Sequence, residues 1–259
     1  VKNIADGSHS YGATYKGRPV GTLADVTTFS FHPVKNITTG EGGMVMVATD
    51  EKLTERAKYF RAHGINSSPA ARAASGKHFY EMVELGLNYR LTDIQCALGL
   101  GQLKKLPQFL EKRREIAARY DAVVDGELAP YITRVANAAE IENAYHLYVI
   151  RVHGKHFPAA SKCTRDAAFG FLRDLGIGVN VHYPLVHKHP FWREYLAGEL
   201  EAGNEAPSLT VAEAAYEEII SMPMFPKMTE EQIARCVDAL RALKSHFLEA
   251  SEAGVEKGA

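Results

Sequence analysis

Lys35 lies between an aromatic segment and a turn-forming segment. Residues 28–31 read Thr-Phe-Ser-Phe, and residues 38–43 read Thr-Thr-Gly-Glu-Gly-Gly. The first composition favours a strand and the second favours a tight turn. Lys35 is therefore expected near a strand end, where its amine can be presented to a bound ligand. On these residues alone, an ordinary lysine at a strand end is the other interpretation.

A lysine amine reacts with carbonyl groups only when it is uncharged. An ordinary lysine has a pKa of about 10.4, so about one amine in 2,500 is neutral at pH 7. Desolvation and nearby positive charge lower the pKa and raise that fraction. Asp6 precedes Lys35 by 29 residues and offers a carboxylate, which could equally be a turn or cap residue.

Several segments together resemble one enzyme family. Residues 4–17, Ser30, Lys35 and the segment Gly-Leu-Asn-Tyr-Arg-Leu-Thr-Asp-Ile-Gln at 86–95 resemble, in order and spacing, the DegT/DnrJ/EryC1/StrS family of sugar aminotransferases, which use pyridoxal 5'-phosphate (PLP). The resemblance implies an α/β fold of the aspartate aminotransferase type (fold type I). The chain would carry the C-terminal part of the large domain and a small α/β domain.

Two segments are similar to a narrower group within that family. Residues 85–106 and 177–184 look closest to the transaminases of pseudaminic acid biosynthesis. Those enzymes aminate C4 of a UDP-linked 4-keto-6-deoxy-N-acetylhexosamine. Sister enzymes that aminate other nucleotide-linked keto sugars share most of these sequence features.

The resemblance implies a cofactor site. Lys35 would bind the PLP aldehyde covalently and then move the reacting proton, and Asp6 would bind the pyridine nitrogen and keep it protonated. Ser30 would bind the phosphate, and Asn88 would reach the phosphate in the neighbouring subunit. His9 matches a position that contacts the region of the ring hydroxyl, although a structural histidine is the alternative.

The remaining implied site residues concern phosphate and substrate. Arg90 would anchor the phosphate or a substrate carboxylate, or else belong to the start of the next helix. His182, Tyr183 and His187 would bind the nucleotide sugar, and His63 would line the sugar site. A strand-end histidine and a core tyrosine are the alternatives for His182 and Tyr183.

The implied reaction is a transamination in two halves. An amino acid, most simply glutamate, gives its amino group to the cofactor, which passes it to C4 of the sugar. A homodimer with shared sites is expected, acting in the cytoplasm in polysaccharide biosynthesis. A dehydratase branch of the family has histidine at the lysine position, so Lys35 argues against that branch. A second hypothesis is a partner-dependent or non-catalytic homologue that binds the cofactor or the sugar nucleotide.

Composition excludes other classes of function. The 259 residues are 46% hydrophobic and 24% charged, with a net charge of −1, which gives no general attraction to nucleic acid or membrane surfaces. Three widely spaced cysteines and eleven histidines show no metal-ligand spacing. Free thiols, buried or partly buried, are expected. No apolar run approaches the length of a membrane span, and the first residues given show no basic-then-apolar pattern.

The positions of glycine, proline and capping residues between apolar segments predict the secondary-structure elements and two domains. We expect domains at 1–125, the remainder of the large domain with an interdomain helix, and at 126–259. Family members carry a long preceding portion, and we expect this chain to need an oligomeric partner to complete a parallel sheet.

The same residues predict the individual elements. Strands are expected at 1–5, 26–31, 43–48, 144–152, 177–182 and 219–223. Helices are expected at 50–63, from 92, and at 107–124, 164–175, 208–218 and 229–247. A mobile loop is expected at 67–77, and a frayed end after about 247.

Overall fold

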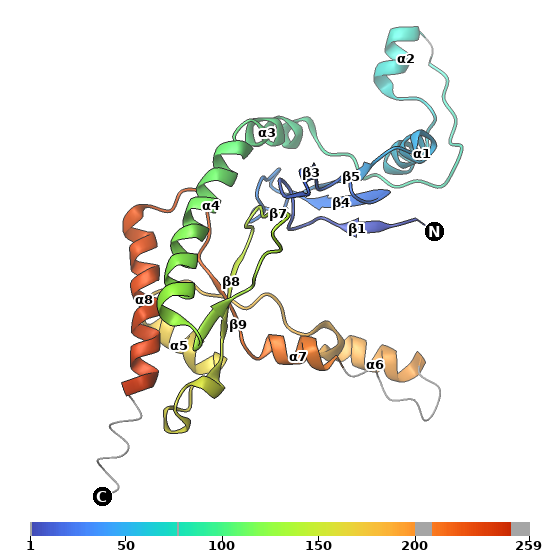
Figure 1. Cartoon of the computed structure of the whole chain (residues 1–259). Helices are drawn as coiled ribbons and strands as arrows, with labels where there is room; N and C mark the ends of the chain where they lie inside the picture. The colour runs from blue at the N-terminus through green and yellow to red at the C-terminus, as the bar shows by residue number, and fades with distance from the viewer. Residues whose placement is uncertain (1, 77, 200–208, 250–259) are drawn as a thin grey trace, which may run out of the picture. The chain divides into compact units, whose positions relative to one another are not determined.

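The computed structural model describes residues 2–76, 78–199 and 209–249, which form two compact units (Figure 1). Unit 1 comprises residues 1–111 and 138–146, and unit 2 comprises residues 112–137 and 147–259. The units divide within a helix, ahead of residue 125, and the expected domains 1–125 and 126–259 stay a prediction. Most of the C-terminal segment expected to fray lies outside the described residues.

Unit 1 contains a sheet of three strands in the order β1-β4-β5, formed by β1 (Ile4–Asp6), β4 (Val26–Ser30) and β5 (Gly43–Val47). β1 and β4 are parallel, whereas β4 and β5 are antiparallel. The three predicted strands are confirmed, but the expectation of a wholly parallel sheet is wrong. The connection between β4 and β5, residues 31–42, contains turns and no crossover helix, so the chain returns antiparallel.

A second small sheet of unit 1 follows from a hairpin. β2 (Thr14–Tyr15) and β3 (Arg18–Pro19) are joined by Lys16 and Gly17, both at positive φ, and β7 (Ile141–Glu142) pairs with β2. Positive φ at both turn residues matches the twist of a two-residue hairpin. The strands predicted from the sequence did not include this hairpin.

Capping residues determine where the helices of unit 1 begin. Asp50 caps α1 (Glu51–Arg61), and Thr92 and Gln95 form a capping box at the start of α3 (Asp93–Leu103), which confirms the helix predicted from residue 92. The mobile loop predicted at 67–77 is wrong, because the described part of it contains α2 (Pro69–Ser75). The Ser68 side chain accepts a hydrogen bond from Ala71, and Pro69 is compatible with the first helical turn.

The core of unit 1 lies beside the segment that carries Lys35. Phe29, Phe31 and Ile37 are buried together. The ring of Tyr11 packs edge-on against Phe29 and Phe31, with centroid distances of 4.9 and 5.7 Å. These contacts fix the end of β4 and the start of the following loop against the loop that leaves β1.

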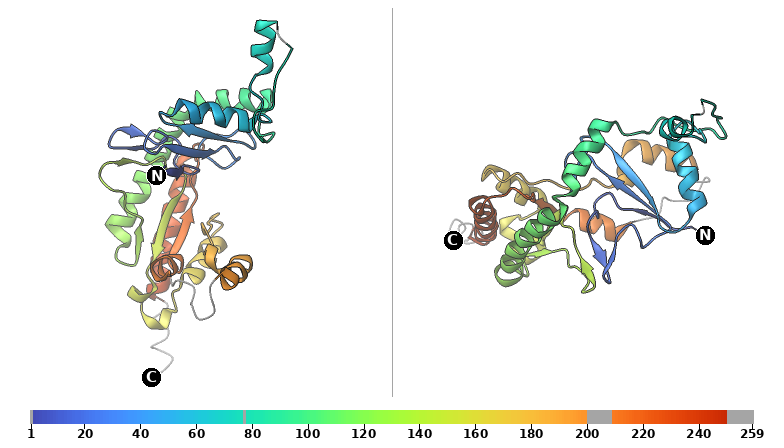
Figure 2. Two further views of the ribbon diagram at one scale, coloured as in Figure 1. Left: turned by 90° about the vertical axis from the view of Figure 1, so that its right-hand side faces the viewer. Right: turned by 90° about the horizontal axis from the view of Figure 1, so that it is seen from above.

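Unit 2 is built around an antiparallel sheet in the order β6-β8-β9, formed by β6 (Ile132–Arg134), β8 (Tyr148–Val152) and β9 (Ile219–Met222). Its helical elements are α4 (Leu106–Val123, entering from unit 1), η1 (Val124–Leu128), η2 (Gly154–His156), η3 (Ala159–Ser161), α5 (Arg165–Asp174), η4 (Val186–Lys188), α6 (Pro190–Glu199), α7 (Thr210–Tyr216) and α8 (Glu230–Glu249). Within this unit α8 runs beside α4 (Figures 1 and 2), and Lys112 and Arg119 both bond to Glu230.

Most helices predicted for unit 2 are confirmed, but the strand predicted at 177–182 is wrong. That segment makes a single bridge, between Asn180 and Ser221. The predicted strand at 144–152 begins only at Tyr148, and α6 was not predicted. The side chains of Ile177 and Val179 are instead buried against the rest of the unit, with only 4% and 3% of their surface exposed.

The charged segment 111–115 contains one buried cation. Arg113 is buried, and its Nη1 donates to the carbonyl of Met224, 3.1 Å away. Cys163 and Cys236 are buried free thiols as expected, whereas Cys96 is exposed.

Candidate active site

The parallel pairing of β1 and β4 brings the ends of both strands to one edge of the sheet. Asp6 is the last residue of β1 and lies opposite Thr28 of β4, two residues before Ser30. Lys35 follows in a turn whose backbone N–H donates to the carbonyl of His32, 3.0 Å away. Ligands of α/β proteins bind outside the carboxyl ends of parallel strands, which is where these side chains lie.

Asp6 and Lys35 are close enough to influence each other's ionisation. Partial burial lowers the pKa of the Lys35 amine below its ordinary value, and the charge of Asp6 opposes that shift. The pKa of Asp6 is lowered first by hydrogen bonds from Ser8, including one from its backbone N–H at 2.9 Å, and further by the charges of His9 and Lys35. Asp6 is therefore a stable carboxylate, and Lys35 is an amine that is easier to deprotonate than usual.

Asn36 holds the Lys35 segment in place, a role that sequence reasoning missed. Its side chain is buried, and its Nδ2 donates to the carbonyl of Tyr11 at 3.0 Å and to that of Ala144 at 3.4 Å. Tyr11 belongs to the loop that leaves Asp6, so one amide connects the two reactive segments. The sequence contained one signal for this role, a polar residue between Lys35 and the apolar Ile37. If such an amide is buried, it needs hydrogen-bond partners.

Ser30 and His9 lie on the same two segments. Ser30 is half-buried at the end of β4, and its hydroxyl oxygen accepts a long hydrogen bond of 3.4 Å from the backbone N–H of His32. The His9 ring packs edge-on against the ring of His146, with centroids 4.4 Å apart. Both side chains are thus placed on the loops that carry Asp6 and Lys35.

His63, Asn88 and Arg90 form a second group in unit 1. The backbone N–H of His63 donates to the carbonyl of Leu87, and the adjacent residues Ala62 and Asn88 form an antiparallel β-bridge. The Asn88 Oδ1 accepts from the Arg90 Nε at 3.1 Å. This group is exposed except for His63, which is half-buried.

One hydrogen bond connects the start of α3 with the loop beyond Lys35. The Gln95 Nε2 donates to the carbonyl of Glu41, 2.9 Å away. Within the part of the chain that the structure describes, no hydrogen bond or ion pair joins Asn88 or Arg90 directly to Asp6 or Lys35. The structure therefore groups Asp6, His9, Ser30 and Lys35 together and places the second group on a neighbouring segment.

Two of the three site residues predicted in unit 2, His182 and His187, each contact a polar side chain from another element. The His182 Nδ1 lies 2.9 Å from the hydroxyl of Ser221, which is buried on β9, and the His182 ring packs against Tyr183. The His187 Nε2 lies 3.0 Å from a carboxylate oxygen of Glu213. Ser221 and Glu213 were not predicted as part of this group.

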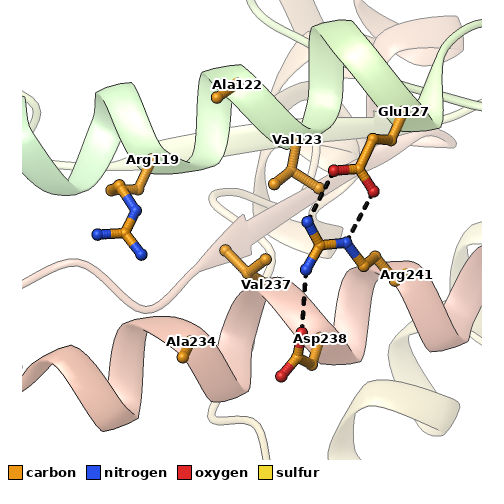
Figure 3. Close-up of a pocket in the computed structure, with 8 residues that line it drawn as sticks. All are labelled: Arg119, Ala122, Val123, Glu127, Ala234, Val237, Asp238 and Arg241. Carbon is orange, nitrogen blue, oxygen red and sulfur yellow. Dashed lines mark hydrogen bonds and ion pairs between the residues drawn. The ribbon is translucent and has the colours of Figure 1, made fainter.

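A pocket in unit 2 offers no comparable chemistry. Figure 3 shows the residues that line it on α4, η1 and α8, with the Arg241 guanidinium held by both oxygens of Glu127, each at 2.7 Å, and by Asp238 at 3.1 Å. The hydrogen bond from Arg241 lowers the pKa of Glu127 and keeps it charged. Three charged groups of this pocket, Arg241, Glu127 and Asp238, are thus paired with one another.

Within residues 2–76, 78–199 and 209–249, no three side chains of the metal-binding types come together as a metal site. The described helices also include none with both the length and the apolar character required to cross a membrane.

Comparison with known proteins gives a consistent set of relatives. The family model described as the DegT/DnrJ/EryC1/StrS aminotransferase family matches residues 1–241. A UDP-4-amino-4,6-dideoxy-N-acetyl-beta-L-altrosamine transaminase of Campylobacter jejuni is 40% identical over 225 residues, which are 87% of this chain and 54% of that protein.

Solved structures of related proteins share the fold. PseC of Helicobacter pylori, an aminotransferase of pseudaminic acid biosynthesis, has a TM-score of 0.79 and 32% identity, covering 95% of this chain and 60% of its own. The PLP form of the putative sugar aminotransferase Spr1654 of Streptococcus pneumoniae has a TM-score of 0.79 and 28% identity, covering 96% and 59%. The predicted fold type I class is confirmed, and the chain spans 54% to 60% of the length of these relatives.

Proposed function

Because the chain belongs to the DegT/DnrJ/EryC1/StrS aminotransferase family, we propose that it uses PLP to transfer an amino group from an amino acid to a keto sugar linked to a nucleotide. The observation that carries this proposal is the pair formed by Asp6 and Lys35 at the shared edge of β1 and β4. The names of the relatives support a nucleotide sugar as the acceptor.

The donor set at this edge fits PLP. The cofactor has an aldehyde, a basic ring nitrogen and a phosphate, and the edge offers an amine of lowered pKa, a carboxylate held in its charged form and a hydroxyl. A neutral amine is the form that attacks an aldehyde, and a carboxylate stabilises a protonated ring nitrogen. Ser30 is the hydroxyl placed to donate to the phosphate.

Each residue then has a defined task. Bound PLP supplies an electron sink for the bonds of the carbon next to the transferred nitrogen. Asp6 holds the positive charge of the ring nitrogen. The Lys35 Nζ would hold the cofactor, and it would accept and return the proton at the reacting carbon. In the second half of the reaction, the same Nζ would deliver a proton to the sugar carbon that receives the nitrogen.

The finer assignments are part of the proposal. Glutamate is the proposed donor and C4 of a UDP-linked 4-keto-6-deoxy sugar the proposed acceptor, supported by the name of the Campylobacter jejuni relative. His9 and Arg90 are proposed for the cofactor, and His63, His182, Tyr183 and His187 for the substrate. We further propose cytoplasmic action in polysaccharide biosynthesis.

A homodimer with shared sites is also proposed. The surface of α3 supports it, because none of its residues is buried and Ile94 and Leu100 are 83% and 62% exposed. Apolar side chains gathered on one exposed helix mark a protein contact. Asn88, which lies on the segment just before α3, would then serve the cofactor of the partner.

The direct test is an assay of amino transfer. The purified chain is incubated with PLP, glutamate labelled with ¹⁵N and a UDP-linked 4-keto-6-deoxy sugar, and the sugar product is examined by mass spectrometry. The proposal expects ¹⁵N in the sugar. Formation of 2-oxoglutarate with no labelled sugar would retain the first half of the reaction and reject this acceptor.

A further inference from the structure

The carboxylate of Glu213, on α7, is shared by two side chains of η4. Its Oε1 lies 3.0 Å from the His187 Nε2, and its Oε2 lies 3.1 Å from the Lys188 Nζ. Each oxygen of the carboxylate therefore has its own partner. His187 and Glu213 are 26 positions apart in the sequence, so this contact joins two separate elements of unit 2.

The charge of Glu213 decides which nitrogen of His187 carries a hydrogen. The hydrogen bonds from His187 and Lys188 lower the pKa of the Glu213 carboxyl, which is therefore ionised near neutral pH. An ionised carboxylate has no hydrogen and can only accept. The His187 Nε2 must then be the donor of the hydrogen bond that joins the two side chains.

This assignment leaves the His187 Nδ1 as an acceptor. In a neutral imidazole one nitrogen carries the hydrogen and the other carries a lone pair. Lys188 already balances the charge of Glu213, so the pair requires no second cation. The His187 side chain is 22% exposed, and its Nδ1 makes no hydrogen bond with any residue in the described ranges. A ligand that reaches this ring meets a lone pair.

His182 does not offer the same group. Its Nδ1 lies 2.9 Å from the hydroxyl of Ser221, and its Nε2 lies 3.4 Å from the Nδ2 of Asn180. Both of its ring nitrogens therefore face polar groups of the protein itself. Of the two histidines proposed for the substrate in unit 2, His187 is the one with a nitrogen left for a ligand.

We propose that Glu213 is a positioning residue for the nucleotide sugar, and that it presents the His187 Nδ1 as an acceptor for a hydroxyl group of that substrate. The inference rests on the proposed function, since it names the chemistry by which His187 recognises the substrate. Sugar and ribose rings carry hydroxyl donors. Phosphate oxygens are acceptors, and they would meet the lone pair of Nδ1 unfavourably.

The tautomer of His187 can be read by NMR without any turnover. The full chain is labelled with ¹⁵N in its eleven histidines and examined at about pH 8, where imidazole is ordinarily neutral. His187→Asn identifies the resonances of His187 by their loss. We expect the Nε2–H tautomer in the unchanged chain and in Glu213→Gln, whose amide oxygen can still accept. Glu213→Ala should give a mixture of tautomers, because the acceptor that selects one of them is gone.

Binding of a nucleotide sugar gives the second measurement. Calorimetry uses UDP-N-acetylglucosamine as a probe without a ketone. Its Kd should rise by about two- to tenfold in Glu213→Ala, from the weakening of one hydrogen bond, and should change little in Glu213→Gln. A parallel titration with UDP separates the two sources of hydroxyl groups. Equal weakening of both ligands assigns the contact to the ribose, and weakening of the nucleotide sugar alone assigns it to the hexose.

Glu217→Ala is the matched control, because Glu217 follows Glu213 by one helical turn and its exposed side chain makes no ion pair within the described residues. It should leave both the tautomer and the Kd unchanged. The Nδ1–H tautomer in the unchanged chain, an unaltered tautomer or Kd in Glu213→Ala, or equal weakening by Glu217→Ala would overturn this inference alone. Failure of both ligands to bind the unchanged chain would instead reject the nucleotide-sugar acceptor, and this inference with it.

Discussion

The side-chain amide of Asn36 donates a hydrogen bond to the backbone carbonyl of Tyr11, 3.0 Å away. This bond joins the residue after Lys35 to the loop that follows Asp6. The two residues proposed to hold opposite ends of the cofactor ring are therefore connected by a buried contact that neither of them makes itself. Their spacing depends on Asn36 as well as on the pairing of β1 with β4.

Replacing Asn36 should loosen the cofactor site. Asn36→Ala leaves the carbonyls of Tyr11 and Ala144 without this donor, at a cost of about 1–3 kcal/mol in the free energy of unfolding. PLP should also dissociate several times faster, as measured by its visible absorbance during dialysis. Asn66→Ala, which removes an exposed amide of the same unit, is the control. Equal PLP retention in both variants would remove Asn36 from the site.

Lys35 should react with amine reagents at a lower pH than Lys112. Burial lowers the pKa of Lys35, so its neutral form is reached earlier as the pH rises, whereas the hydrogen bond with Glu115 raises the pKa of Lys112. Labelling of the PLP-free chain between about pH 7 and 10, followed by peptide mass spectrometry, compares the two side chains. Labelling of Lys112 at the lower pH would contradict the electrostatics of the site.

Asp6→Asn should move the labelling of Lys35 to a still lower pH. The Asp6 carboxylate stabilises the charged ammonium, so its removal lowers the pKa of Lys35 further. The same variant should retain PLP but lose most of the half-reaction with glutamate, because an amide does not hold a positive ring nitrogen as a carboxylate does. A half-reaction rate close to that of the unchanged chain would exclude Asp6 from the site.

Gly64 should be intolerant of any side chain. It adopts a φ of +68°, and a Cβ there would lie 1.7 Å from the carbonyl oxygen of Glu84. Gly64→Ala should lower the free energy of unfolding by about 2 kcal/mol or more and disturb the pairing that places His63 and Asn88. Gly101→Ala is the control, because its Cβ meets no atom within 4 Å and alanine favours the helix α3. Similar thermal denaturation curves for both variants would refute the steric argument.

Local signals in the sequence predicted much of this fold. The helix starts near Thr92 and Thr164 were predicted, and at both starts the threonine side chain accepts a hydrogen bond from a backbone N–H three positions later. The strand ending at Asp6 and the strand before Lys35 were likewise predicted. The segment 177–182 has the composition of a strand but forms irregular chain with one β-bridge, from Asn180 to Ser221. Its conformation therefore depends on residues that are distant in the sequence.

The site shows the same division between local and distant information. Lys35 and Asp6 were predicted from a family pattern, whereas Asn36 and Ser221 act through contacts that only the fold creates. The Asn36 amide reaches a residue 25 positions earlier, and Ser221 reaches His182 across 39 positions. The burial of Arg113 was missed for the same reason, since its partner carbonyl at Met224 is 111 positions away.

The central claim is that Lys35 is the residue that binds PLP. The measurement that tests it most directly is borohydride reduction of the purified chain after addition of PLP, followed by peptide mass spectrometry. We predict that the reduced cofactor is attached to Lys35, and that Lys35→Ala leaves the chain folded and without covalently bound cofactor. Attachment of the cofactor chiefly to another lysine such as Lys112, or unchanged attachment in Lys35→Ala, would contradict the account.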